Sequence, residues 1–127
     1  MEQLYPYKIL FIEDEQATRD NYIKYLKMFF REVYEADDGE KAYQIYKEKK
    51  PDIMIMDINI PKLNGLEILK KIRENDYTTK VVIITAHTDK KLLVEATALQ
   101  LTKYLIKPVN RMALKEALEL CIKELSK

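Results

Sequence analysis

Residues that could handle a phosphoryl group or its metal ion stand at the ends of four short apolar runs in this 127-residue chain. The carboxylates Glu13 and Asp14 follow the first run, and Asp57 ends the second. Thr85 and Lys107 close the two later runs with a hydroxyl and an ammonium group. Brought together, three carboxylates, a hydroxyl and an ammonium would form a site for Mg²⁺ and a phosphoryl group.

The apolar runs predict buried strands of a parallel sheet, because such strands are covered on both faces and read as continuous apolar stretches. Strand and helix patterns alternate along the whole chain, which indicates an α/β architecture. Ligands of open α/β sheets bind beyond the carboxyl ends of the strands, where the residues named above would lie. The predicted strands are 8–13, 32–36, 53–57, 80–85 and 102–106, and the predicted helices are 16–30, 39–49, 66–75, 89–100 and 110–125. The second strand is the least apolar and suits a sheet edge.

The composition is ordinary for a globular protein, with 47% hydrophobic and 34% charged residues. A net charge of +1 with interleaved signs argues against broad electrostatic capture of nucleic acid. No apolar run approaches the roughly 20 residues that span a bilayer, and the first residues lack the pattern of a secretory signal. The lone Cys121 is expected to be a core thiol and fits a reducing cytoplasm. With no linker or repeat, residues 1–127 are expected to form one domain.

From Lys8 to about Leu125 the chain resembles the receiver domain of bacterial two-component response regulators. The matching pieces are the Glu13-Asp14 pair, the segment Asp57-Ile58-Asn59-Ile60-Pro61 with Gly65 beyond it, Thr85-Ala86, and Tyr104 three residues before Lys107-Pro108. The resemblance implies a flavodoxin-like, doubly wound, five-stranded parallel sheet of order 2-1-3-4-5 with five helices.

The resemblance also implies a role for each acidic residue. Asp57 is the expected phosphoacceptor, a carboxylate nucleophile that forms an aspartyl phosphate. Asp14 and Asp57 would bind Mg²⁺ directly, Asn59 would add its backbone carbonyl, and Glu13 would act mostly through water. A cation is also expected on physical grounds, since adjacent carboxylates repel one another unless a positive charge neutralises them.

The expected phosphate-binding residues are Lys107, Thr85 through its hydroxyl, Ala86 through its amide, and Asn59. In the family, the threonine moves toward the phosphoryl group and the aromatic ring turns inward, so Thr85 and Tyr104 form the expected switch pair. The resemblance further implies a cis peptide bond before Pro108.

The expected function is that of a phosphoacceptor signalling domain, which catalyses its own phosphorylation but does not turn over a free substrate. The donor would be a sensor histidine kinase or a histidine phosphotransfer protein. The signal would pass to an effector through the face formed by the predicted elements 89–100, 102–106 and 110–125. His87, at the rim of the site, is either an exposed loop residue or, with Asn59, a determinant of the phosphoryl lifetime.

Three alternative functions fit the sequence less well. A haloacid-dehalogenase-type phosphatase would need a second acid two residues after the nucleophile, where this chain has Asn59. A flavodoxin-like cofactor module would need a phosphate loop after the first strand, where the acidic residues would repel an anion. A degenerate receiver that binds partners constitutively would need to have lost at least one of the core site residues, and none is lost here.

One departure from the family is Gln100-Leu101, where Gly-Ala is common and a glycine would end the preceding helix.

Overall fold

Five parallel strands form one sheet in the order β2-β1-β3-β4-β5, in a computed structural model that describes residues 4–86 and 90–127. The strands are β1 (Tyr5–Ile12), β2 (Phe30–Ala36), β3 (Ile53–Asp57), β4 (Lys80–Thr85) and β5 (Lys103–Ile106). The helices are α1 (Gln16–Lys27), α2 (Gly39–Lys49), α3 (Gly65–Arg73), α4 (Lys90–Ala98) and α5 (Arg111–Leu125). The predicted fold class and strand order are confirmed, and β2 is an edge strand as expected.

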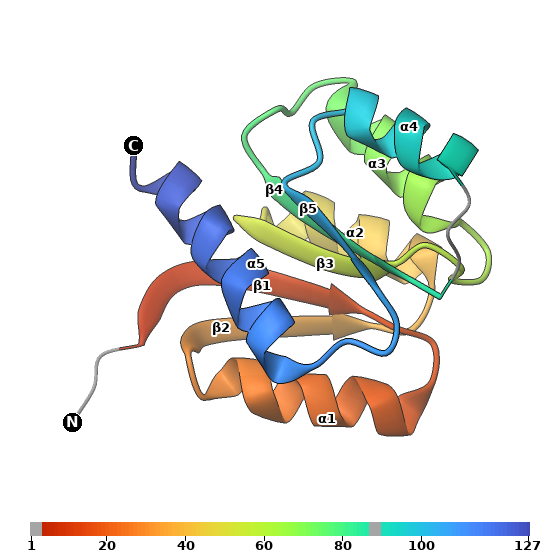
Figure 1. Cartoon of the computed structure of the whole chain (residues 1–127). Helices are drawn as coiled ribbons and strands as arrows, with labels where there is room; N and C mark the ends of the chain where they lie inside the picture. The colour runs from red at the N-terminus through yellow and green to blue at the C-terminus, as the bar shows by residue number, and fades with distance from the viewer. Residues whose placement is uncertain (1–3, 87–89) are drawn as a thin grey trace.

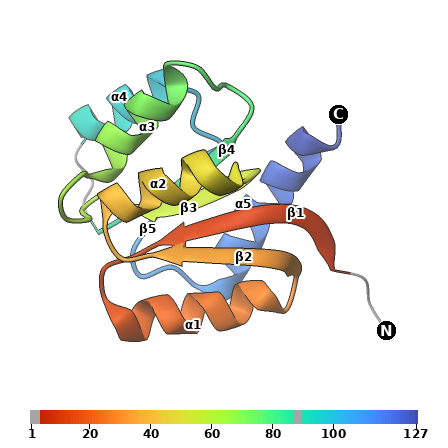
Figure 2. The same ribbon diagram turned by 180° about the vertical axis from the view of Figure 1, so that it is seen from behind.

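Helices cover both faces of the sheet, with α1 and α5 on one side and α2, α3 and α4 on the other (Figures 1 and 2). Successive side chains of a strand point to opposite faces. In β1, Ile9 and Phe11 therefore pack under α1 and α5, whereas Leu10 and Ile12 pack under the other three helices. Burying each such side chain contributes about 1.5–3 kcal/mol. Among the helices that the structure describes, none has the length and apolar character needed to cross a bilayer.

The first helix ends earlier than predicted, at Lys27 instead of residue 30. Phe30 opens β2, is 2% exposed and pairs with Tyr5, while the Tyr5 amide donates to the Phe29 carbonyl over 2.7 Å. The prediction was wrong here because the apolar side chains of residues 29 and 30 fit a helical repeat as well as a strand. Pairing with β1 places these residues in a strand, because β1 begins three residues before its predicted start.

Capping side chains fix where the helices begin. Glu15, Asp38, Asn64 and Asn110 each accept a hydrogen bond from the backbone amide three residues on, at α1, α2, α3 and α5 respectively. Such caps contribute about 1 kcal/mol each. They also explain the one-residue shifts from the predicted starts of α3 and α5.

The backbone at Gln100 is left-handed, with φ of 60°, just after α4 ends at Ala98. This is the position where the family commonly has glycine, so the chain keeps the turn without the residue best suited to it. The buried guanidinium of Arg73 supports the turn by donating to the carbonyls of Leu99 over 2.7 Å and Gln100 over 2.9 Å.

Gly39 and Gly65 open α2 and α3, and neither has a positive φ. Close backbone approach is what makes them necessary. A Cβ added at Gly39 would lie 1.7 Å from the Leu63 carbonyl oxygen. At Gly65 the nearest atom to an added Cβ would be the Ile58 Cα, at 3.0 Å.

We therefore expect Gly39→Ala to destabilise the fold by about 3 kcal/mol, because the new methyl group overlaps backbone that cannot move aside. Gly65→Ala is the matched control and should stay within about 1 kcal/mol of the wild type, since the contact is tighter than usual but alanine favours the helix. Urea unfolding of the three proteins measures both values. Equal stability of the two variants would contradict the claim that close backbone approach requires glycine at position 39.

A saturated carboxylate lies at the opposite end of the sheet from the predicted site. The Asp76 side chain accepts hydrogen bonds from the hydroxyls of Tyr46 and Thr79, both over 2.6 Å, and from the amides of Thr78 and Thr79. Burial opposes ionisation of Asp76, but the hydrogen bonds from Thr79 and Tyr46 outweigh it and hold the pKa of Asp76 well below its usual range.

A lowered folded-state pKa means that Asp76 stabilises the fold above its unfolded pKa of about 3.9 and loses that contribution as the pH falls below it. Asp76→Asn should therefore be less stable than the wild type between pH 6 and 8, and the difference should shrink below about pH 4. Urea unfolding from pH 8 down to below pH 4 measures the stability difference between the two proteins. Asp20→Asn, at an exposed position of α1, reports the general effect of losing one carboxylate. A stability difference that is independent of pH would contradict the role of the ionised carboxylate.

Candidate functional site

The predicted site residues Glu13, Asp57, Thr85 and Lys107 lie where four neighbouring strands end. Asp57 and Thr85 are the last residues of β3 and β4, and Glu13 and Lys107 directly follow β1 and β5. The strands are in register at these ends, since Asp57 pairs with Ile84 and Thr85 with Ile106. Glu13, Asp57 and Thr85 are 4%, 8% and 2% exposed. The sheet thus places polar groups at the edge of its own apolar core.

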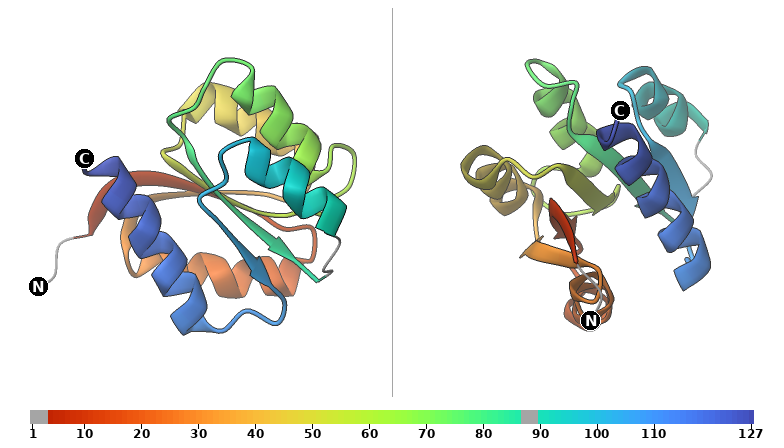
Figure 3. Two further views of the ribbon diagram at one scale, coloured as in Figure 1. Left: turned by 45° about the horizontal axis from the view of Figure 1, so that its top comes forward. Right: turned by 90° about the vertical axis from the view of Figure 1, so that its left-hand side faces the viewer.

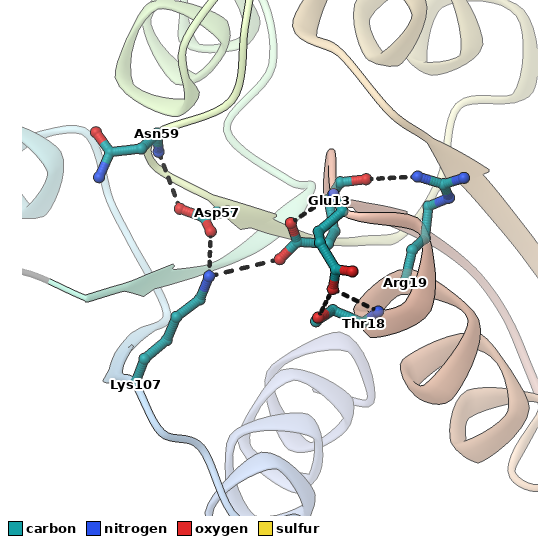
Figure 4. A network of polar contacts seen from close by, with 7 residues as sticks. Glu13, Thr18, Arg19, Asp57, Asn59 and Lys107 are labelled. Atoms are coloured by element: carbon teal, nitrogen blue, oxygen red, sulfur yellow. Dashed lines mark hydrogen bonds and ion pairs between the residues drawn. The ribbon is translucent and has the colours of Figure 1, made fainter.

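The Lys107 ammonium lies between two of these carboxylates (Figure 4). It contacts the Asp57 Oδ2 directly and lies 3.5 Å from the Glu13 Oε1. Its main-chain amide donates to the Thr85 carbonyl over 2.8 Å, and the bond to Pro108 is cis, as the resemblance implied. Partial burial opposes the charge of Lys107, but the hydrogen bond and charge of Asp57 outweigh it and raise the pKa of Lys107.

The Asp57 carboxylate is oriented through both oxygens. Oδ2 contacts Lys107, and Oδ1 accepts a hydrogen bond of 2.9 Å from the backbone amide of Asn59. The loop after β3 is fixed in turn by main-chain bonds from Ile58 to Ile84 over 3.0 Å and from Gly65 to Ile58 over 3.1 Å. Asp57 is therefore held in one orientation, facing the residues that follow β1.

Glu13 and Asp14 differ in burial although they are neighbours. Glu13 is buried and accepts from the Glu15 amide over 3.0 Å, while Asp14 is exposed. Burial raises the pKa of Glu13, although the Glu15 amide and the Lys107 charge act in the opposite direction. When all are ionised, Glu13, Asp14 and Asp57 carry two more negative charges than Lys107 neutralises.

This donor set fits Mg²⁺. The ion takes oxygen ligands, commonly one or two carboxylates, and fills the remaining positions with water and phosphate oxygens. Within residues 4–86 and 90–127, no three His, Cys, Asp or Glu side chains gather into a ready-made metal cage. A few carboxylates at an open edge with an excess of negative charge suit an ion that keeps several waters.

The other predicted residues lie around this centre. The Thr85 side chain is buried at the end of β4, and Ala86 is exposed directly after it. Tyr104 lies on β5, beside the strand that carries Thr85, and pairs with Ile83. It is 43% exposed. His87 lies outside the described residues.

Sequence reasoning missed Arg19. Its Nη1 donates to the Glu13 carbonyl over 2.9 Å, and its Nε donates to the Glu35 Oε1 over 3.0 Å. The one trace in the sequence is that Arg19 stands four residues after Glu15, the spacing of an ordinary helical ion pair. That pattern gives no sign of a contact with the loop after β1 or with β2.

The sequence matches the family model of the response regulator receiver domain over residues 9–119. It is 33% identical over 113 residues to the chemotaxis protein CheY of Listeria monocytogenes, covering 88% of this chain and 95% of that protein. It is 31% identical over 114 residues to the transcriptional regulatory protein DegU of Brevibacillus brevis, again over 88% of this chain. The chain spans 48% of DegU, about half the length of that relative.

Solved structures agree with the sequence matches. A response regulator receiver domain protein from Clostridium thermocellum has a TM-score of 0.88 at 30% identity, covering 94% of this chain and 97% of that one. The signal receiver domain of a LuxO repressor protein from Vibrio parahaemolyticus has a TM-score of 0.88 at 29% identity, covering 96% and 94%. From the family match over residues 9–119, these relatives and the shared fold, we conclude that the chain belongs to the response regulator receiver domain family of two-component systems, a family of signalling domains.

Proposed function

We propose that this receiver domain accepts a phosphoryl group on Asp57 from the histidine of a sensor kinase or a phosphotransfer protein. One observation carries the proposal. Asp57 ends a buried strand with one carboxylate oxygen on the Asn59 amide and the other on Lys107, beside a second buried carboxylate. A structural salt bridge alone would not require the second carboxylate, which increases the repulsion at the site.

In the proposed reaction an Asp57 carboxylate oxygen attacks the phosphorus atom. The phosphorus–nitrogen bond to the donor imidazole breaks, and its electron pair returns to the ring. The phosphoryl oxygens are stabilised by the Lys107 ammonium, the Thr85 hydroxyl and the Ala86 amide, so the chain contributes mainly position and charge. These groups belong to the receiver, which therefore catalyses its own phosphorylation.

Asp14, Asp57 and the Asn59 carbonyl would hold Mg²⁺, with Glu13 acting through water. When bound, the ion supplies positive charge to the phosphoryl oxygens. Phosphorylation of Asp57 also frees Lys107, because the acyl phosphate that forms no longer carries the carboxylate charge that the ammonium now contacts. Lys107 then serves the phosphoryl oxygens instead.

The proposed output surface is the face formed by α4, β5 and α5, which lie next to one another (Figure 3, left). This face carries large apolar side chains that are exposed to solvent: Val94 on α4, Tyr104 and Ile106 on β5, and Met112 on α5. An effector could cover them, either as a separate protein or as a further domain. The chain nearly matches CheY of Listeria monocytogenes in extent and spans about half of DegU, so relatives of both lengths exist.

The coupling we propose runs from Thr85 to Tyr104. If the Thr85 hydroxyl moves toward the phosphoryl group, it leaves space into which the half-exposed Tyr104 ring turns. The face around β5 then exists in two arrangements, and phosphorylation favours one of them.

Acetyl phosphate with Mg²⁺ should place one phosphoryl group on the wild type and none on Asp57→Asn, because the amide cannot act as the nucleophile. Intact-mass spectrometry measures the adduct. Asp20→Asn, at an exposed position of α1, is the matched control and should be phosphorylated like the wild type. A full adduct on the Asp57→Asn protein would refute the assignment of the acceptor.

Phosphorylation should also change amide hydrogen exchange in α4 and β5, beyond the loops that touch Asp57. Thr85→Ala should still accept a phosphoryl group but should lose most of the change around Tyr104, since no hydroxyl remains to move. Exchange that changes only near Asp57 in the wild type would contradict a switch through Tyr104.

A further inference from the structure

Arg19 connects the acidic loop after β1, which is defined here as residues 13–15, to β2. The proposed chemistry uses the first of these segments but not the second. The Arg19 side chain comes from the first turn of α1 and is 13% exposed. One guanidinium nitrogen binds the Glu13 carbonyl and another binds the Glu35 carboxylate on β2 (Figure 4 shows the first contact). Because both anchors are held by one planar group, they keep a fixed separation.

The contact with the Glu13 carbonyl controls the residue that follows. A peptide unit is planar, so fixing the carbonyl oxygen of Glu13 also fixes the amide nitrogen and Cα of Asp14. On the other side of Glu13, its amide continues the ladder by donating to Ala36 over 3.1 Å. Asp14 is exposed, so little packing orients its side chain, and the course of its backbone decides which way it can point.

The charge of Arg19 acts in the opposite direction. Hydrogen bonds are the main reason that the pKa values of Glu15 and Asp37 are lowered, and the nearby positive charge of Arg19 lowers both a little further. A positive charge near the acidic loop would by itself weaken the binding of a cation. Geometry and charge therefore predict opposite effects when Arg19 is removed.

We propose that Arg19 is a positioning residue for the metal end of the site, which aims Asp14 toward Asp57 by holding the Glu13–Asp14 peptide unit. This inference rests on the proposed Mg²⁺ site. It assigns to Arg19 an effect on metal affinity that is carried by the backbone of the ligand and not by direct contact with the ion.

The test is the Mg²⁺ dissociation constant of the unphosphorylated protein, measured by titration calorimetry with Mg²⁺ alone. Arg19→Lys keeps the charge but loses the planar fork, and Arg19→Gln loses both. We expect each to weaken Mg²⁺ binding by at least about threefold, less than the tenfold or more seen when a partner of the ligand side chain itself is lost. Lys24→Gln removes an exposed charge from the same helix and should stay within about twofold of the wild type.

Tighter binding in Arg19→Gln with no change in Arg19→Lys would overturn the inference, because charge alone would then explain the role of Arg19. Unchanged binding in both variants, or a wild type that binds no Mg²⁺, would also overturn it. If Arg19→Gln fails to fold in a thermal melt, Arg19→Lys alone decides.

Phosphorylation by acetyl phosphate separates this inference from the proposed function. If the wild type is phosphorylated but both Arg19 variants bind Mg²⁺ normally, the inference about Arg19 fails and the proposed function stands. A wild type that binds Mg²⁺ but accepts no phosphoryl group defeats the proposed function, while weaker Mg²⁺ binding in both variants would still support the inference. With both correct, the Arg19→Lys protein needs more Mg²⁺ for half-maximal phosphorylation, and its rate at saturating Mg²⁺ stays within about twofold of the wild type.

Discussion

The ammonium of Lys107 between the buried carboxylates of Glu13 and Asp57 is the interaction on which the rest of the site depends. Two like charges held this close to an apolar core repel one another and lose hydration at the same time. A single cation between them offsets part of both effects and leaves an excess of negative charge. The site is therefore stable enough to fold, yet it still favours a further positive charge.

Strand geometry brings this about without any dedicated scaffold. The strands end in register, so each contributes its next polar residue to the same edge, and the apolar run before it anchors that residue in the core. β3 is buried along its whole length, which explains why Asp57 has little freedom. The opposite end of the sheet has the reverse character, because the Asp76 carboxylate is saturated with hydrogen bonds. The saturated carboxylate and the carboxylates that favour a further positive charge thus lie at opposite ends of the strands.

Much of this was predictable from the sequence, for reasons that are local. Continuous apolar runs identify buried strands, and Glu13, Asp57 and Lys107 are found by their places at the ends of such runs. Phe30 was assigned wrongly because its partner Tyr5 is distant in sequence and a local repeat cannot register the pairing. Arg19 and Arg73 were missed for a related reason. Each binds backbone carbonyls outside its own helix, Arg19 that of Glu13 and Arg73 those of Leu99 and Gln100, and a carbonyl carries no mark in the amino-acid sequence.

The bonds from Arg73 to the carbonyls of residues 99 and 100 have a mechanical consequence. They fasten the carboxyl end of α4 to α3, whereas the amino end of α4 follows the loop beyond Thr85. Two bonds to adjacent carbonyls leave little freedom at this junction, so a shift of α4 must either carry the end of α3 with it or break both bonds. A protein that binds α4 is thereby coupled to α3, even where it makes no contact with α3.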